Sequence, residues 1–297
     1  MSHDPIEWIA ADWGTTNLRC WAMSSSGHVL FRAESESGMN SIVKSGGNFE
    51  TALLELIRPW LREGETIRVE ACGMVGAKQG WIEAPYCETP CSPATLRSKA
   101  PSSDDGIEVW IRSGVKQSAP PDVMRGEETQ IAGLLSLHPE FEGLVCLPGT
   151  HTKWAQVRNK EIQSFQTFFT GEVFSLLANQ SVLRLTLAPE GTDETAFLQG
   201  VTTSFQSPES LLSDGFRLRA EALLEELDGV EARSRLSGLL LGHELAGVFK
   251  ASDQPEFVFL VGSDELVELY RVALSSLSIT HRSITNESAI LGGLSKI

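Results

Sequence analysis

The residues best suited to chemistry lie in a short polar turn that follows an apolar strand near the N-terminus. In Ile9-Ala-Ala-Asp-Trp-Gly-Thr-Thr-Asn-Leu-Arg19, Asp12 ends the apolar run and Gly14-Thr-Thr-Asn17 forms the turn. Backbone amides and hydroxyls in such a turn can bind phosphate oxygens, and a carboxylate is a hard oxygen ligand for Mg²⁺ or its waters. The turn alone is equally compatible with a plain solvated hairpin.

A second copy of this pattern favours the phosphate-binding interpretation. Leu144-Val-Cys-Leu-Pro-Gly-Thr-His-Thr-Lys-Trp154 again runs from apolar strand through a Gly-Thr turn into a strand. The offset between the copies stays within two residues at three landmark pairs, which are Gly14 and Gly149, Trp21 and Trp154, and Val29 and Ile162. This shared spacing predicts a duplicated domain with two phosphate-binding hairpins.

A glycine-rich loop follows the strand expected at 67–72. In Gly73-Met-Val-Gly-Ala-Lys-Gln-Gly-Trp81 the glycines allow the backbone to approach a small ligand, and Lys78 could hold a carboxylate. The alternative is an irregular connection with a solvated lysine. The chain has no Walker loop and no G-x-G-x-x-G fingerprint, so neither common nucleotide motif applies.

Three helix starts carry further polar groups. Glu127 and Glu128 fall in the first turn of a helix expected over 124–135, where the helix dipole also favours acids that merely cap it. Glu172 is expected to start a helix that runs to Val182, with Thr170 and Gly171 in its capping turn. Gly262-Ser263 separates an apolar strand from a helix, a geometry that can place a base or phosphate on the helix N-terminus.

Hairpins that alternate with helices predict an α/β fold with mixed sheets. A helix is expected over 48–61, and the Pro- and Ser-rich stretch 86–118 ends at the breaker Pro120-Pro121. We therefore expect an N-terminal domain over 1–120 and a C-terminal domain over 121–297.

Composition excludes several classes of protein. The 297 residues carry a formal net charge of −15, which argues against a nucleic-acid partner because phosphates would be repelled. No run reaches the ~18 apolar residues of a membrane span. Five cysteines without a C-x-x-C motif, and a polar start with no leader, favour the cytoplasm. The six histidines show no metal-ligand spacing.

Four segments in order resemble the 2-dehydro-3-deoxygalactonokinase family, a branch of the superfamily that contains actin, sugar kinases and heat-shock-chaperone ATPases. They are D-W-G-T-T-N-L-R at the N-terminus, R-G-E-E-T-Q-I at 125–131, L-P-G-T-H-T-K-W at 147–154 and T-G-E at 170–172. The resemblance spans nearly the whole chain. It implies two ribonuclease-H-like domains of the actin and hexokinase type around a nucleotide cleft.

The same resemblance implies ATP-dependent phosphorylation of the 6-hydroxyl of 2-dehydro-3-deoxy-D-galactonate, with ATP as co-substrate and Mg²⁺ as cofactor. Asp12 would organise the metal. Related sugar kinases carry the acid that accepts the hydroxyl proton in a G-x-G-D-like turn before the second phosphate hairpin. Glu127 occupies that place here, with Glu128 as the neighbouring candidate and Asp193 or Glu172 next in line.

The expected binding residues form three groups. Phosphate contacts are assigned to Gly14, Thr15, Thr16, Asn17, Arg19, Gly149, Thr150, His151, Thr152 and Lys153. Gly262 and Ser263 are expected to border the adenosine. The sugar acid is assigned to Asn40, Gly73, Met74, Val75, Gly76, Lys78, Thr170, Gly171 and Glu172.

Two alternative functions stay open at this point. An exopolyphosphatase-like phosphohydrolase of the same fold would share the phosphate hairpins but lack a sugar pocket. An actin-like protein would use its nucleotide state to control a partner, and would need a filament-forming insertion or a peptide-binding domain. A homodimer is one expectation for the assembly.

Overall fold

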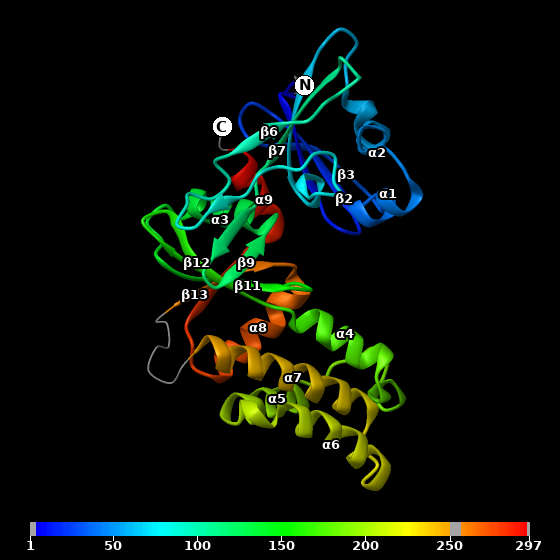
Figure 1. Ribbon diagram of the computed structural model, residues 1–297, viewed down its shortest axis with the longest axis vertical. Coiled ribbons are helices and arrows are strands. Elements are labelled where there is room, and N and C mark those ends of the chain that lie inside the picture. The colour runs from blue at the N-terminus through cyan, green and yellow to red at the C-terminus, as the bar shows by residue number, and fades with distance from the viewer. Residues whose placement is uncertain (1–3, 250–256, 296–297) are drawn as a thin grey trace. The chain divides into compact units, whose positions relative to one another are not determined.

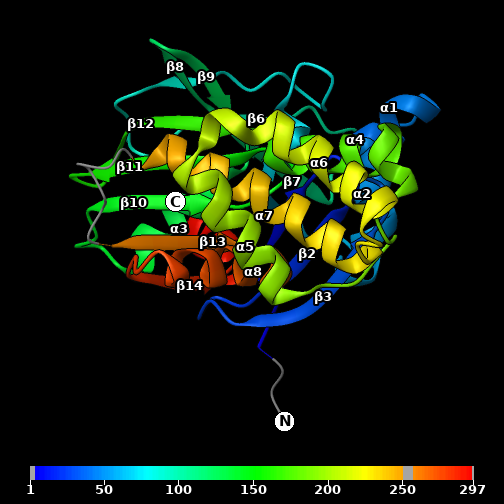
Figure 2. The same cartoon turned by 90° about the horizontal axis from the view of Figure 1, so that it is seen from below.

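The computed structural model describes residues 4–249 and 257–295, so the first three residues of the polar start lie outside it. The chain forms two compact units (Figures 1 and 2). The first unit comprises Met1–Glu142, Val157–Ser164 and Asn286–Ile297, and the second comprises Gly143–Gln156 and Phe165–Thr285. This division differs from the boundary expected at residue 120, because the chain up to residue 142 and the last helix both belong to the first unit.

The first unit is built on a six-stranded sheet of order β3-β2-β1-β4-β7-β6. Its strands are β1 (Trp8–Trp13), β2 (Leu18–Met23), β3 (Val29–Ser35), β4 (Ile67–Gly73), β6 (Arg97–Lys99) and β7 (Ile107–Arg112). A three-stranded sheet contains β5 (Cys87–Glu88), β8 (Val115–Ser118) and β9 (Pro121–Met124). The helices are α1 (Met39–Ser45), α2 (Phe49–Ile57), α3 (Glu127–Leu137) and α9 (Asn286–Leu294).

Both faces of β1 are buried, which explains its continuous apolar sequence. Ile9, Ala11 and Trp13 lie in one core cluster, whereas Trp8 and Ala10 lie in another that includes residues of α9. β1 and β4 run parallel, and such paired strands are covered on both sides. The apolar run that leads to Asp12 is therefore a central strand of the sheet, and this strand holds the Asp12 carboxylate on a rigid backbone.

Helices α3 and α9 pack with almost no space between their backbones. A Cβ on Gly133 would lie 1.7 Å from the carbonyl oxygen of Ala289, and one on Gly293 would lie 2.0 Å from that of Thr129. Only glycine allows this approach. The expected break at 120–121 is instead a β-hairpin, since Ser118 and Pro121 are paired between β8 and β9.

The second unit repeats the strand arrangement of the first. Its five-stranded sheet has the order β12-β11-β10-β13-β14, and residues 157–164, where β11 turns into β12, are counted with the first unit. The strands are β10 (Gly143–Leu147), β11 (Thr152–Arg158), β12 (Glu161–Phe168), β13 (Val258–Gly262) and β14 (His281–Thr285). In each sheet three successive strands are followed by parallel ones, so the expected α/β fold with two ribonuclease-H-like halves is confirmed.

Helices cover the described part of the second unit. They are α4 (Thr170–Gln180), α5 (Glu194–Gln206), α6 (Leu211–Leu224), α7 (Gly229–Val248) and α8 (Asp264–Ser276). Short 3-10 turns in the described chain are η1 (Arg58–Trp60), η2 (Met74–Gly76), η3 (Val182–Leu185) and η4 (Pro208–Ser210). Figure 1 shows α5, α6 and α7 side by side. Gly238 permits the contact of α5 with α7, because its Cβ would lie 2.0 Å from the Phe197 oxygen.

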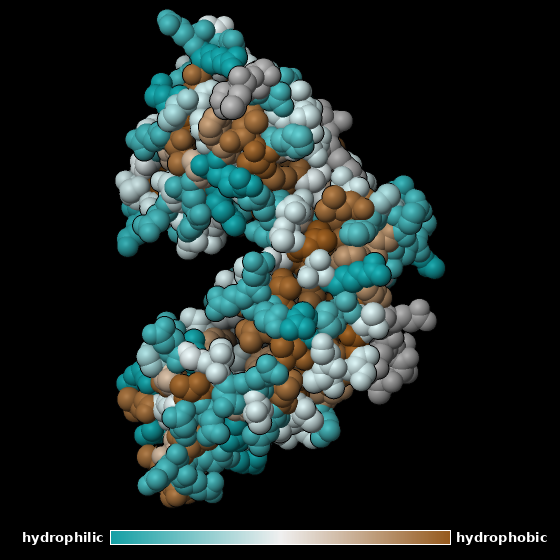
Figure 3. Space-filling model, turned by 180° about the vertical axis from the view of Figure 1, so that it is seen from behind, coloured by the Kyte–Doolittle hydropathy of each residue, from teal (hydrophilic) through white to brown (hydrophobic). Residues whose placement is uncertain are grey.

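The surface agrees with the acidic, polar composition. Figure 3 shows hydrophilic residues over much of the face it presents, with smaller apolar areas between them. Exposed apolar side chains in the second unit include Leu212 and Phe216 of α6. Within residues 4–249 and 257–295, no helix combines the length and apolar character that a membrane span requires.

Candidate active site

The first Gly-Thr turn is fastened to the loop that begins α1. The Gly38 and Asn40 amides donate to the Thr16 and Thr15 carbonyls, both at 3.0 Å. A Cβ on Gly38 would lie 2.2 Å from the Thr16 carbonyl carbon, so the two loops touch. The side chains of Thr15 and Thr16 stay exposed. Asn40, expected near the sugar acid, thus lies directly beside the turn expected to bind phosphate.

Asp12 forms an ion pair across the hairpin with Arg19. Arg19 Nη2 lies 2.7 Å from Asp12 Oδ2, and the two side chains are 41% and 13% exposed. Burial raises the pKa of Asp12, and the guanidinium of Arg19 opposes this rise. Arg19 was expected to contact phosphate, but the structure places it on Asp12 because the two residues are register partners in β1 and β2. Asn17 likewise turns away and donates to Glu34 Oε1 at 2.8 Å.

Three segments of the first unit meet at the carboxyl ends of β1 and β4. Trp13 is paired with Gly73, and a Cβ on Gly73 would lie 2.6 Å from the Trp13 carbonyl oxygen. Gly126 has a φ of +111°, and its Cβ would lie 3.4 Å from Gly73 Cα. Asp12, the glycine-rich loop and the turn before Glu127 are therefore neighbours. Ligands of α/β sheets bind at this end of the strands.

The glycine-rich loop folds onto itself through η2. A Cβ on Gly80 would lie 2.2 Å from the Val75 carbonyl oxygen. Val75 was expected to contact the sugar acid, but its side chain is fully buried in the core. Met74 is half-buried and Lys78 is exposed. Gly73 and Gly76 are buried as well, so of the loop residues assigned to the sugar acid only Met74 and Lys78 have accessible side chains.

Arg125 is a cation beside this loop to which sequence reasoning assigned no role. Its Nη2 donates to the Ala84 carbonyl at 2.9 Å, and its guanidinium lies 4.3 Å from the centroid of the Tyr86 ring. A Cβ on Gly76 would lie 2.8 Å from Nη1. Arg125 is the first residue of the motif R-G-E-E, but the sequence does not show that its side chain lies on Ala84 and Tyr86.

Glu127 and Glu128 take opposite environments at the start of α3. Glu127 is half-buried and its Oε2 accepts the Arg125 amide at 3.0 Å. Glu128 is fully buried, and its two oxygens accept the Gly126 amide at 2.7 Å and the Thr129 hydroxyl at 3.1 Å. Burial, followed by the charge of Glu127, raises the pKa of Glu128 to about 8. Of these two carboxylates, Glu127 is therefore the accessible one.

In the second unit, the second Gly-Thr turn is fastened to the start of α4. The Glu172 amide donates to the Thr150 carbonyl at 3.1 Å, and a Cβ on Gly171 would lie 2.7 Å from the Gly149 oxygen. His151 Nε2 lies 2.6 Å from Glu172 Oε2, with both side chains about half exposed. Glu172, a reserve candidate for the base, is thus paired with His151.

Thr152 and Lys153 were expected to contact phosphate, but the structure buries both side chains. Thr152 is 1% exposed and its hydroxyl lies 2.8 Å from the Tyr270 hydroxyl. Lys153 is 6% exposed and its Nζ donates to the Thr167 hydroxyl at 2.9 Å. Successive residues of β11 point to opposite faces of the sheet, and each of these two side chains is buried against its own partner. They fix the hairpin, while Gly149 and Thr150 remain at its tip.

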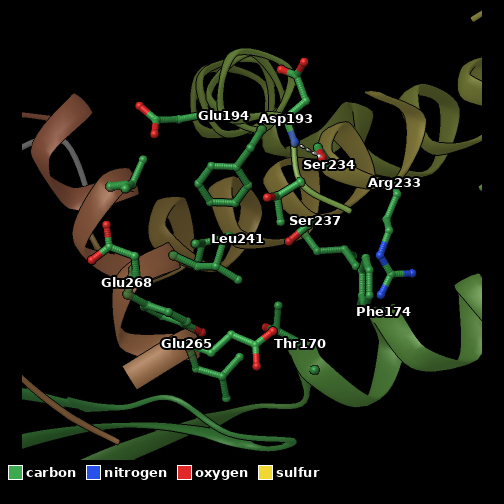
Figure 4. A pocket seen from close by; sticks show the side chains of 18 of the residues that line it. Thr170, Phe174, Asp193, Glu194, Arg233, Ser234, Ser237, Leu241, Glu265 and Glu268 are labelled. Atoms are coloured by element: carbon green, nitrogen blue, oxygen red, sulfur yellow. Dashed lines mark hydrogen bonds between the residues drawn. The ribbon is translucent and has the colours of Figure 1, made fainter. Parts of the chain in front are cut away.

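A cavity of about 500 Å³ opens next to this turn, within the second unit. Figure 4 shows its wall, formed by α4, the 190–194 loop, α7 and α8. Its lining includes Gly149, Thr170, Gly171, Phe174, Asp193, Arg233, Ser237, Leu241, Glu265 and Glu268. Part of the cavity wall therefore consists of Gly149 of the second turn and of Thr170 and Gly171 at the α4 N-terminus, and the N-terminus of a helix favours anions.

Gly262 and Ser263 lie beside the cavity but are not part of the lining described for it. A Cβ on Gly262 would lie 3.4 Å from the Pro148 carbonyl oxygen, so the glycine abuts the second turn. The lining on this side begins at Glu265, in the first turn of α8. Strand β13 and helix α8 lie where the sequence predicted a strand and a helix. The cavity lining begins at Glu265, two residues after Ser263.

Several wall residues were missed because four separate elements contribute them. The Arg233 guanidinium lies 4.9 Å from the centroid of the Phe174 ring. Asp193, a reserve candidate for the base, caps α5 by accepting the Ala196 amide at 2.8 Å, and its own amide donates to Ser234. No local pattern marks these residues as neighbours, since the loop, α4 and α7 are distant in sequence.

The carboxylate set fits Mg²⁺ only as a partner of a polyphosphate. In the part of the chain that the structure describes, no three His, Cys, Asp or Glu side chains form a metal-binding group. Mg²⁺ is commonly held by one or two carboxylates together with substrate phosphates and water. Asp12, a single carboxylate beside a turn rich in amides and hydroxyls, suits that arrangement.

Comparisons with known proteins agree along the whole chain. A family model described as 2-keto-3-deoxy-galactonokinase matches residues 12–297. A protein of Rhizobium meliloti (strain 1021) named "Probable 2-dehydro-3-deoxygalactonokinase" is 36% identical, with 97% of this chain and 95% of the relative covered. A 2-dehydro-3-deoxygalactonokinase of Escherichia coli (strain K12) is 34% identical, with 98% and 97% covered. A crystal structure from Sinorhizobium meliloti, described by the same activity, has a TM-score of 0.90, 36% identity and 97% coverage of both chains.

Proposed function

This chain belongs to the 2-keto-3-deoxy-galactonokinase family, and we propose that it transfers the γ-phosphoryl group of ATP to the 6-hydroxyl of 2-dehydro-3-deoxy-D-galactonate. The observation that carries this proposal is the pair of Gly-Thr turns at equivalent strand ends of two similarly ordered sheets, one beside Glu127 and one beside the cavity. In this proposal the two turns would bind the phosphates, Glu127 would act as the base, and the cavity would hold the nucleoside.

Phosphoryl transfer depends mainly on positioning and charge stabilisation. Thr15, Thr16 and Thr150 present exposed hydroxyls and amides for phosphate oxygens. Glu127 would orient the substrate hydroxyl and accept its proton as the new bond to phosphorus forms. Mg²⁺ held by Asp12 would neutralise phosphate charge when it is bound. Asn40 beside the first turn, and Met74 and Lys78 in the glycine-rich loop, would contact the sugar acid.

The cavity of the second unit is the proposed adenosine site. Its volume of about 500 Å³ lies within the range of small-molecule pockets, and apolar groups such as Phe174 and Leu241 lie beside polar ones. Thr170 and Gly171, which the sequence assigned to the sugar acid, line the cavity together with Gly149 of the second turn. The phosphates would therefore extend toward that turn, and these two residues would contact the nucleotide instead. The bound nucleotide would thus contact α8 at Glu265 and Glu268 instead of Ser263.

The free cysteines are consistent with a reducing compartment. The structure has free thiols, as expected of a cytoplasmic enzyme, at Cys20, Cys72, Cys87, Cys91 and Cys146. The cytoplasmic location and a homodimeric assembly are part of the proposal. Analytical ultracentrifugation of the purified chain would measure the assembly directly.

Measurement of ADP release with Mg-ATP and a panel of acceptors tests the proposed activity. We expect turnover with 2-dehydro-3-deoxy-D-galactonate and far less with gluconate-derived acids and polyols. ADP release that needs no acceptor would indicate a phosphohydrolase instead. Turnover with another acid of the panel would keep the kinase class and change the substrate.

Thr150→Ala is expected to raise the KM for ATP by about two- to tenfold and leave the KM for the sugar acid unchanged. The reason is the loss of one hydroxyl placed on a phosphate oxygen, about 0.5–1.5 kcal/mol. Steady-state kinetics with each substrate varied in turn would measure both constants. Thr203→Ala, which removes an exposed hydroxyl elsewhere in the second unit, is the control. A change confined to the sugar KM would remove Thr150 from the phosphate site.

Glu128→Gln is expected to stabilise the protein more at pH 9 than at pH 6. The pKa of Glu128 is raised to about 8 in the folded chain, above the 4.5 of an unperturbed carboxyl. Its contribution to stability is therefore present at low pH and is lost as pH rises through about 8. Each pKa unit corresponds to about 1.4 kcal/mol, so the gain at pH 9 is on the order of a few kcal/mol.

Thermal unfolding at several pH values would check this expectation. Glu63→Gln is the matched control, since Glu63 is solvent-exposed. We expect the melting temperature of Glu128→Gln to exceed that of the wild type by an amount that grows with pH. A difference that stays constant with pH would mean that Glu128 is not held protonated.

A further inference from the structure

A buried carboxylate, Glu244 of α7, joins four elements of the second unit. Glu244 is 1% exposed. Its Oε1 accepts the indole N–H of Trp154 at 2.7 Å and the hydroxyl of Tyr270 at 2.8 Å, and its Oε2 accepts the hydroxyl of Thr170. These partners belong to β11, α8 and the first residue of α4. One side chain therefore connects the second phosphate hairpin with three helices.

The connection continues to the turn itself through Tyr270. The Tyr270 hydroxyl donates to Glu244, so its oxygen is left to accept a hydrogen bond from the Thr152 hydroxyl at 2.8 Å. Thr152 ends the Gly149–Thr152 turn. The carboxylate thus fixes the direction of both hydrogen bonds, because it can only accept while it is ionised.

The groups held by Glu244 are those that face the cavity. Thr170 and Tyr270 line it, and the α4 N-terminus that begins at Thr170 is bonded to the turn through the Glu172 amide and the Thr150 carbonyl at 3.1 Å. Figure 4 shows Thr170 at the cavity beside the start of α4. A shift of Thr170 would therefore move the amides of the turn and of the helix together.

We propose that Glu244 is a positioning residue for the phosphoryl donor, which holds the Gly149–Thr152 turn and the N-terminus of α4 in the arrangement that binds the nucleotide phosphates. This inference rests on the proposed function. Glu244 lies beneath the site and acts through Thr170, Trp154 and Tyr270. It sets nucleotide affinity without touching the nucleotide.

Electrostatics explain why a carboxylate suits this position. Burial raises the pKa of Glu244 to about 6, while its hydrogen bonds from Thr170, Trp154 and Tyr270 oppose that rise. Burial also raises the pKa values of Tyr270 and Cys146 well above their ordinary values, so both stay neutral near pH 7. Glu244 is then an anionic acceptor surrounded by donors, an arrangement with charge-assisted hydrogen bonds.

Glu244→Gln tests the proposal with little change in volume. An amide presents an N–H group where one carboxylate oxygen accepted a hydrogen bond, so at least one of the three donors loses its partner. We expect the dissociation constant for ADP, measured by titration calorimetry, and the KM for ATP to rise by about five- to tenfold, as for one net hydrogen bond. The KM for the sugar acid should stay within about twofold of the wild type, because the proposed sugar-acid contacts belong to the first unit, whereas the partners of Glu244 belong to the second. A twofold change is about 0.4 kcal/mol, which is less than one net hydrogen bond.

A double-mutant cycle and a matched control separate positioning from general stability. Thr170→Val removes the donor on α4, and its effect on ADP affinity should not add to that of Glu244→Gln. Glu221→Gln is the control, since it breaks a carboxylate–arginine contact between α6 and α7 in the same unit, away from the turn. We expect the control to lower the melting temperature and leave ADP affinity unchanged.

Three outcomes would overturn the inference. They are unchanged ADP affinity in Glu244→Gln, equal losses of ADP and sugar-acid affinity, and a loss in the Glu221→Gln control as large as that in Glu244→Gln. Failure of the proposed function has a different signature, because the wild-type protein itself would then bind no ADP or phosphorylate no sugar acid.

Discussion

Replacement of Glu127 by glutamine is expected to lower kcat by at least about a hundredfold while the affinities for ATP and sugar acid change little. A carboxylate that receives the substrate proton as phosphoryl transfer proceeds contributes roughly 10²–10⁴-fold. Its ordinary pKa near 4.3 does not allow it to ionise an alcohol beforehand. Its role is to orient the hydroxyl and accept the proton late, so the loss should appear in kcat.

The structure strengthens the choice of Glu127 over its neighbour. Glu128 is fully buried and its oxygens are used by Gly126 and Thr129. Glu127 is half-buried, and the turn that precedes it lies against Gly73 at the carboxyl end of β4. Neighbouring helical residues differ by about 100° in direction, which accounts for the two environments.

Glu128→Gln is the natural control for this experiment. We expect it to retain most of the turnover, whereas Glu127→Gln should bind ADP normally in calorimetry and release little ADP in the kinetic assay. A dead Glu128→Gln enzyme together with an active Glu127→Gln enzyme would transfer the role to Glu128. Activity in both would place the base outside α3. The next candidates would be Asp193, which caps α5, and Glu172, which pairs with His151.

The parts of the site that local sequence determines could be predicted. A strand that ends at a Gly-Thr turn needs only neighbouring residues, so the positions of both Gly-Thr turns and of the helix that begins at Glu127 could be predicted from the sequence. The repeated order of the sheets follows from the repeated hairpins. The glycine-rich loop was also located, because glycine punctuation is visible in any sequence.

The parts that depend on distant contacts could not be predicted. The return of α9 to the first unit rests on backbone contact between Gly133 and Ala289, which no local pattern shows. The cavity wall combines α4, α7 and α8 with the 190–194 loop. The inward directions of Thr152 and Lys153 depend on Tyr270 and Thr167, their partners elsewhere in the chain.

Arg19 shows how one such contact changes an interpretation. Its position after the first turn suggested a phosphate contact, but antiparallel pairing of β1 with β2 places it opposite Asp12 at 2.7 Å. Mg²⁺ and Arg19 would then attract the same carboxylate. The arginine holds Asp12 in place at the turn, and an incoming metal–nucleotide complex would share or displace that contact.

Asp12→Asn is accordingly expected to reduce turnover by at least about a hundredfold while the sugar acid still binds. Asparagine has nearly the same size and removes the negative charge. Metal-ion catalysis supplies several kcal/mol of charge stabilisation, and about 2.7 kcal/mol corresponds to a hundredfold change in rate. The loss should depend on metal, so the Mg²⁺ concentration that gives half-maximal rate should rise in the variant.

Arg19→Met separates a metal role of Asp12 from a purely structural one. This variant removes the ion pair but keeps the carboxylate, so we expect it to retain far more activity than Asp12→Asn. ADP release across a series of Mg²⁺ concentrations, with sugar-acid affinity measured by calorimetry, would compare the two. Equal losses in both variants, with an unchanged Mg²⁺ dependence, would show that Asp12 serves only to anchor Arg19. The carboxylate is needed for the metal only if Asp12→Asn alone changes that dependence.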